Sequence, residues 1–152
     1  GAGLSSAGLQ KKVQVIRQAV EFHRPDPADP VDVLAKVGGF DIAGMAGTFL
    51  AGAAHHVPVV IDGFISAVAA LVAVRLAPEA SGCMLASHVS KEPAARMLLE
   101  ELGKSAVLHG EMCLGEGTGA VMLFPILDMA LAVYHGMATF ESTHIEAYVP
   151  LS

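Results

Sequence analysis

The stretch Val57-Pro58-Val59-Val60-Ile61-Asp62-Gly63 decides the fold of this chain. Its β-branched run shows no alternation of apolar and polar residues, which is typical of a strand buried on both faces of a sheet. Asp62-Gly63 ends the strand, and residues 65–76 are then expected to form a helix. A buried strand followed at once by a helix favours an α/β protein.

Further along the chain, short apolar segments alternate with helical patterns. Residues 83–86 and 105–109 predict a second and a third strand, and residues 92–102 predict the helix between them. Such alternation requires crossover connections and therefore a parallel sheet. We predict an α/β fold in which a Rossmann-like parallel sheet is flanked by helices.

Three polar or glycine-rich segments follow the predicted strands: Asp62-Gly63, residues 87–90 and residues 114–119. Ligands of open α/β sheets bind outside the carboxyl ends of the strands. Although these segments lie far apart in the sequence, we expect them to meet at one crevice.

The flanking helices carry clear start and stop signals. Residues 9–20 form an amphipathic pattern with Ser5 or Ser6 as the N-cap. Asp29 and Pro30 are expected to begin a short helix that ends at Gly38-Gly39.

Two more helices are notably apolar. A helix over residues 41–54 contains Gly44, Gly47 and Gly52, which weaken a helix unless another backbone approaches closely. A long helix starts near residue 118 and reaches about residue 135, with a kink expected at Pro125. Residues 118–147 are therefore predicted as a carboxyl-terminal helical segment, and residues 30–135 as the α/β core.

Composition excludes several classes of protein. The 152 residues are 53% hydrophobic and 16% charged, so disorder is excluded, and the net charge of −6 gives no footprint for nucleic acid. Cys83 and Cys113 form no C-x-x-C pair, and the seven histidines show no metal-binding spacing. The start, Gly-Ala-Gly, has neither a basic nor an apolar segment of a signal peptide. We expect a cytoplasmic protein without a metal site.

The mean hydropathy of +0.56 is high for a water-soluble domain. The longest stretch without charged residues runs over 42–61 and could span a bilayer by length. Because His55, His56 and Pro58 interrupt it, we interpret it as helix, turn and buried strand, and we expect no membrane span. A buried sheet and a subunit interface account for the hydropathy instead.

Glu116 is the most informative residue of the glycine-rich segment 114–119. Glycines next to a helix start suit either a tight turn or a phosphate cradle. A carboxylate in the middle of the loop would repel phosphate, whereas the helix dipole keeps it ionised and able to accept a proton. The pattern alone leaves open whether Glu116 is functional or a common acid at a helix start.

Other polar residues are equally ambiguous from pattern alone. Lys12, beside Lys11, is most simply a solvated lysine. Asp62 could cap the helix that follows it or bind a ligand, and Ser90 could cap the helix that contains residue 92.

Four segments together resemble one family. They are residues 32–45 (D-V-L-A-K-V-G-G-F-D-I-A-G-M), 60–66 (V-I-D-G-F-I-S), 87–88 (S-H) and 114–120 (L-G-E-G-T-G-A). In order and spacing, the whole chain 1–152 resembles the carboxyl-terminal portion of nicotinate-nucleotide–dimethylbenzimidazole phosphoribosyltransferase. The family's chains are considerably longer at the amino terminus, where their phosphate loop lies. The resemblance therefore implies that the fold is incomplete. It also implies that this chain by itself turns over substrate slowly or not at all.

This resemblance implies an activity and a set of site residues. The family moves phosphoribose from nicotinate mononucleotide to 5,6-dimethylbenzimidazole, a pentosyl transfer in cobalamin assembly that needs no cofactor, and it is dimeric. Glu116 matches the family's general base. The implied substrate-binding residues are Lys12 (or, as an alternative, its neighbour Lys11), Asp62, Gly63, Ser90, Leu114, Gly115 and Gly117.

Two rival interpretations stay open. The chain could be a non-catalytic fragment or scaffold module that keeps the fold. A generic Rossmann-type nucleotide binder would instead need its glycine loop after the first strand, whereas here the loop follows the later ones.

Overall fold

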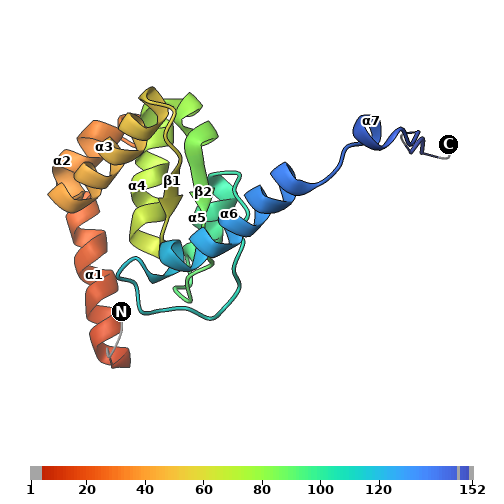
Figure 1. Cartoon of the computed structure of the whole chain (residues 1–152). Coiled ribbons are helices and arrows are strands. Elements are labelled where there is room, and N and C mark those ends of the chain that lie inside the picture. Colours follow the sequence, from red (N-terminus) through yellow and green to blue (C-terminus); the bar gives the residue numbers. More distant parts are fainter. Residues whose placement is uncertain (1–4, 147, 151–152) are drawn as a thin grey trace.

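A short parallel sheet lies at the centre of the molecule (Figure 1). The structure is a computed structural model, and it describes residues 5–146 and 148–150. Strand β1 (Val59–Ile61) pairs in parallel with β2 (Met84–Ala86), in the register that places Val59 beside Met84. Helix α4 (Gly63–Leu76) makes the crossover, followed by the 3₁₀ helix η1 (Pro78–Cys83). The predicted α/β class is confirmed.

The strands are shorter than predicted for local reasons. Pro58 has no N–H for a ladder, and the Val57 N–H donates to the Gly52 carbonyl at 2.8 Å instead of pairing in the sheet. Cys83 is the last residue of η1. Both predicted strands therefore lose residues at their amino-terminal ends and keep their carboxyl ends.

The predicted third strand over residues 105–109 is wrong. A single parallel bridge joins Leu108 to His88, supported by the Leu108 N–H, which donates to the Ser87 carbonyl at 2.9 Å. The segment also touches the end of β2, where the Val107 N–H donates to the Ala86 carbonyl at 3.3 Å, but it forms a bridge at one position and no ladder follows. It still fixes the loop that carries Ser87 and His88.

Helices cover the sheet and supply most of the core. Helix α3 (Phe40–Ala54) packs on α4 and η1, and α4 packs on α5 (Ala95–Glu101). The buried positions are rich in alanine, which lets the helices approach closely: Ala46, Phe49, Ile61, Ala67, Ala69, Ala70, Ala73, Ala80, Met84, Ala86, Leu98, Leu99 and Leu102. The core thus lies between the sheet and α3, α4 and α5.

Helix α5 begins later than the predicted residue 92. The residue before a proline is disfavoured in helical conformation, and Pro93 follows Glu92 directly. The Glu92 carbonyl accepts from the Ala95 N–H in a turn, and the regular helix starts only after it.

At the amino-terminal end, the predicted caps are confirmed. Helix α1 (Ser6–His23) has Ser5 as its N-cap, and α2 (Pro30–Val37) has Asp29 as its N-cap with Pro30 in its first turn. Helix α1 has no buried residue and projects from the α2 side of the molecule (Figure 1).

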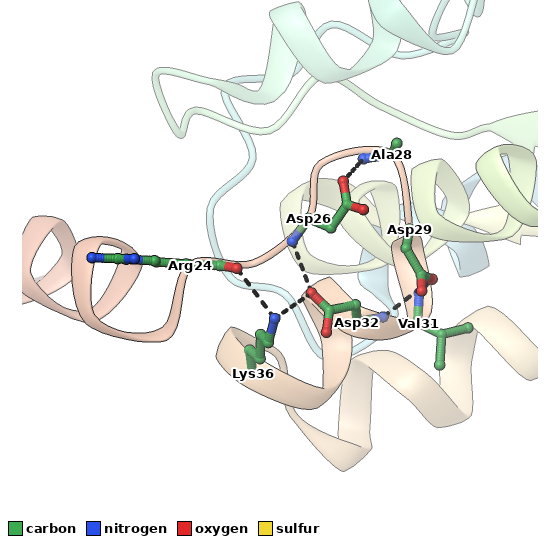
Figure 2. A network of polar contacts seen from close by, with 7 residues as sticks. All are labelled: Arg24, Asp26, Ala28, Asp29, Val31, Asp32 and Lys36. Atoms are coloured by element: carbon green, nitrogen blue, oxygen red, sulfur yellow. Dashed lines mark hydrogen bonds and ion pairs between the residues drawn. The ribbon is translucent and has the colours of Figure 1, made fainter.

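A polar network holds the corner between α1 and α2 (Figure 2). The Asp32 carboxylate accepts from the Asp26 N–H and from Lys36 Nζ, both at 2.8 Å, and Lys36 also donates to the Arg24 carbonyl at 3.1 Å. The Asp26 N–H and then the Lys36 ammonium hold the pKa of Asp32 below its ordinary value. This corner fixes the direction in which α1 leaves the body.

Helix α6 (Thr118–Gly136) begins beside the sheet, continues through Pro125 and leads away from the body to α7 (Phe140–Thr143) (Figure 1). Residues 137–139 are not helical, so the predicted helical segment 118–147 is interrupted there; its residue 147 lies outside the described residues. By length and composition, α6 is the one helix in the described ranges that could cross a membrane, a test that the core helices of water-soluble proteins also pass.

The glycines of α3 differ from one another. A Cβ on Gly52 would lie 2.4 Å from Val59 Cγ2 and 2.8 Å from the Val57 carbonyl oxygen, so the predicted close approach is confirmed there. Gly44 and Gly47 have no atom of the described chain within 4 Å of such a Cβ, so for them that prediction is wrong within this structure.

We therefore expect Gly52→Ala to lower the free energy of unfolding by about 1–3 kcal/mol, because the new methyl group overlaps the β1 segment. Gly47→Ala, the matched control, should raise it by about 0.5–1 kcal/mol through the better helix propensity of alanine. Urea unfolding of the full-length product of the gene encoding this chain, followed by circular dichroism, measures both. Equal destabilisation by the two substitutions would contradict this assignment.

Candidate active site

A cavity of about 390 Å³ opens at the carboxyl ends of β1 and β2. It is lined by residues from the β1–α4 turn, from the loop after β2 and from the loop before α6. The predicted residues that line it are Asp62, Gly63, Ser90, Leu114, Gly115 and Glu116. The expected meeting of three distant segments at one crevice is therefore confirmed.

Asp62 ties two of these segments together. Its Oδ2 accepts from the Gly117 N–H at 3.0 Å and its Oδ1 accepts from the Ala120 N–H at 2.8 Å. The sequence left Asp62 as a cap of the following helix or as a ligand residue. It makes no side-chain cap bond to α4 and instead caps the first turn of α6, so the first alternative is wrong and the ligand role stays a prediction.

Three consecutive residues before α6 have left-handed backbone conformations. Gly115, Glu116 and Gly117 have φ angles of +78°, +58° and +76°. Glycine adopts this region without cost, whereas a residue with a side chain loses about 1–2 kcal/mol there. Such strain persists only where the surroundings fix it, and it gathers at functional sites. The Asp62 bond to the Gly117 N–H is one such constraint.

Glu116 itself is exposed and lines the cavity, so its carboxylate is open to a ligand. Leu114, at 73% exposure, offers an apolar surface at the same rim. A carboxyl group beside an apolar wall suits a flat heterocycle with an N–H group.

Ser90 does not cap a helix, because α5 starts at Ala95. Its Oγ accepts from the Glu92 N–H at a long 3.4 Å and faces the cavity. The hydroxyl is therefore open to a ligand.

Sequence reasoning gave no role to the buried pair Ser87 and His88. Ser87 Oγ donates to the Ile61 carbonyl at 2.7 Å and lies 3.0 Å from His88 Nδ1. The His88 ring fills the space between Gly63 and Gly119, and a Cβ on Gly119 would lie only 1.9 Å from Nδ1. The signal that could have found the pair was two polar residues directly after a buried strand.

Lys12 is not brought to this cavity. It is exposed on α1, as is Lys11, and neither lines the cavity. Within the described ranges, no three His, Cys, Asp or Glu side chains gather as a metal site would require.

Comparison with known proteins identifies the family. The family model described as phosphoribosyltransferase matches residues 1–145. A protein of Acetivibrio thermocellus named nicotinate-nucleotide–dimethylbenzimidazole phosphoribosyltransferase is 50% identical over 150 residues, which are 99% of this chain and 43% of that protein. The chain belongs to this phosphoribosyltransferase family.

Other family members agree with this assignment. The protein of the same name from Ruminiclostridium cellulolyticum is 51% identical over 151 residues. The crystal structure of CobT from Thermus thermophilus superposes with a TM-score of 0.86 at 38% identity, covering 96% of this chain and 43% of that one. The chain thus spans less than half the length of the relatives it matches, and its α/β fold is a part of theirs.

Replacing Asp62 tests its capping role. Asp62→Ala removes both acceptors and should lower the free energy of unfolding by about 1.5–3 kcal/mol, and Asp62→Asn by about half of that, since one oxygen remains. Hydrogen exchange of the Gly117 and Ala120 amides should accelerate in both variants. Asp128→Asn, on the same helix, is the control; unchanged exchange in Asp62→Ala would contradict the role.

Proposed function

We propose that this chain carries the catalytic base of an enzyme that transfers phosphoribose from nicotinate mononucleotide to 5,6-dimethylbenzimidazole. The single observation that carries the proposal is Glu116, an exposed carboxylate at the rim of a 390 Å³ cavity in a strained loop. The names of the relatives support the same substrates.

The reaction needs one base and good positioning. The bare ring nitrogen of dimethylbenzimidazole attacks the anomeric carbon and forms the new C–N bond. The bond to nicotinate breaks and its electron pair returns to the nicotinate ring nitrogen, which loses its positive charge. As the azole becomes cationic, its N–H proton passes to Glu116. Attack from the face opposite nicotinate inverts the β-glycosidic configuration to α.

Charges around the cavity suit the ribose and the ring rather than the phosphate. Asp62, Glu92 and Glu116 line it, and among the described residues no Lys or Arg does. Carboxylates repel phosphate but stabilise the positive charge that develops at the ribose as nicotinate leaves. We therefore place the ribose beside Gly63, Ser90 and Gly115, and the phosphate outside the cavity. Lys12 remains a proposed ligand residue of α1.

Glu116→Gln separates an enzyme from a non-catalytic scaffold of the same fold. Because glutamine cannot accept the proton, we expect kcat to fall by about 10²–10⁴-fold with no change in circular dichroism. Nicotinate release on addition of dimethylbenzimidazole to the full-length gene product measures this loss.

Glu111→Gln is the matched control for this variant. Glu111 is another exposed glutamate with a left-handed φ of +51°, yet it does not line the cavity. Full activity of Glu116→Gln would favour the scaffold interpretation.

We also propose a homodimer in the cytoplasm. The two cysteines are free thiols, as a reducing compartment requires. Helix α6 exposes a large apolar surface, the α6 face: Val121, Met122, Phe124, Met129, Leu131, Val133 and Tyr134. Apolar patches of this kind mark interaction sites.

Met129→Glu tests the dimer. If the α6 face joins two copies, a buried charge should weaken association by about 10²-fold or more, and the mass measured by sedimentation should fall to that of a monomer. Met97→Glu on α5 is matched in residue and exposure (62% against 61%) and should leave the mass unchanged. A dimer that survives Met129→Glu places the interface elsewhere.

A further inference from the structure

His88 is a nearly buried side chain at the candidate active site, with only 5% of its surface exposed. It is the second residue after β2 and lies between Gly63, at the start of α4, and Gly119, in the first turn of α6. The ring therefore touches both helices that begin at the cavity, and it also lines the cavity itself.

Ser87 fixes the tautomer of this ring. A serine hydroxyl has one proton, and the 2.7 Å contact assigns that proton to the Ile61 carbonyl. The 3.0 Å contact between Ser87 Oγ and His88 Nδ1 can then be a hydrogen bond only if Nδ1 carries a proton and donates it. In the neutral ring, Nε2 is consequently bare and acts as an acceptor.

Nε2 is open to a ligand. It has no hydrogen-bond partner in the part of the chain that the structure describes. Since no fully buried side-chain nitrogen or oxygen there lacks a partner, Nε2 is not fully buried and solvent reaches it. Since the side chain is otherwise enclosed and lines the cavity, its free nitrogen has access to the space beside Glu116.

The substrates of the proposed function offer few donors for a bare nitrogen. The phosphate of the nucleotide and the carboxylate of nicotinate only accept hydrogen bonds at neutral pH, and the azole N–H is matched with Glu116. The ribose hydroxyls remain. Resting on the proposed function, we propose that His88 binds the phosphoribosyl donor by accepting a hydrogen bond from a ribose hydroxyl at Nε2.

Two substitutions distinguish the role of Nδ1 from the role of Nε2. In His88→Asn the side-chain amide can replace Nδ1 and keep the bond to Ser87, but nothing reaches the position of Nε2. In His88→Gln the longer side chain can place its carbonyl oxygen where Nε2 lies. The full-length gene product is assayed with nicotinate mononucleotide and with its 2′-deoxy and 3′-deoxy analogues.

With the ribonucleotide, His88→Asn should lower kcat/KM about tenfold, the cost of one neutral hydrogen bond, while His88→Gln stays within about threefold of the wild type. With one of the two deoxy analogues, His88→Asn should cost less than about twofold, because the contacted hydroxyl is already absent. That coupling is not expected of a residue that only supports the fold.

Equal losses with all three donors would overturn the inference and leave the proposed function intact. If the wild type releases no nicotinate, the proposed function fails and this inference with it.

Long-range nitrogen–proton NMR of His88 in the unsubstituted protein adds a readout that needs no variant. It should show a proton on Nδ1 and a shift of Nε2 when the donor is added; a proton resting on Nε2 at neutral pH would overturn the inference.

Discussion

One carboxylate joins the two halves of the candidate site. Asp62 stands at the end of β1 and accepts from the N–H groups of Gly117 and Ala120, which belong to a segment more than fifty residues further along the chain. These two bonds satisfy two of the backbone N–H groups at the start of α6 and hold the strained loop beside the sheet. Together with the close fit of Gly119 against His88, they fix the position of Glu116 relative to the cavity.

The cavity is acidic, so it suits proton acceptance better than phosphate binding. Three carboxylates line it, and such charges suit a developing cation or a proton but repel a phosphate group. A base and a phosphate cradle are difficult to combine in one small pocket. A site whose phosphate-binding groups lie outside this cavity avoids that conflict, and the chain spans only 43% of its relatives.

Sequence predicted what depends on local chemistry. The buried run of β1, the caps at Ser5 and Asp29 and the convergence of the strand ends follow from residue type and order. What failed depends on tertiary contacts: residues 105–109 meet only the last residue of β2 and the chain beyond it. Likewise, the pattern around Asp62 left open a local cap or a ligand role, because no sequence rule connects it with amides at the start of a distant helix.

The glycines of the L-G-E-G-T-G segment illustrate the same limit. Gly115 and Gly117 are needed for their left-handed backbone, which a turn pattern indicates. Gly119 lies in a helix, where glycine is unfavourable, and it is needed because the His88 ring occupies the place of its Cβ. The ring is held there by Ser87, which is held in turn by β1. One sequence motif therefore combines two physical requirements, and the second links the Glu116 loop to the interior of the sheet.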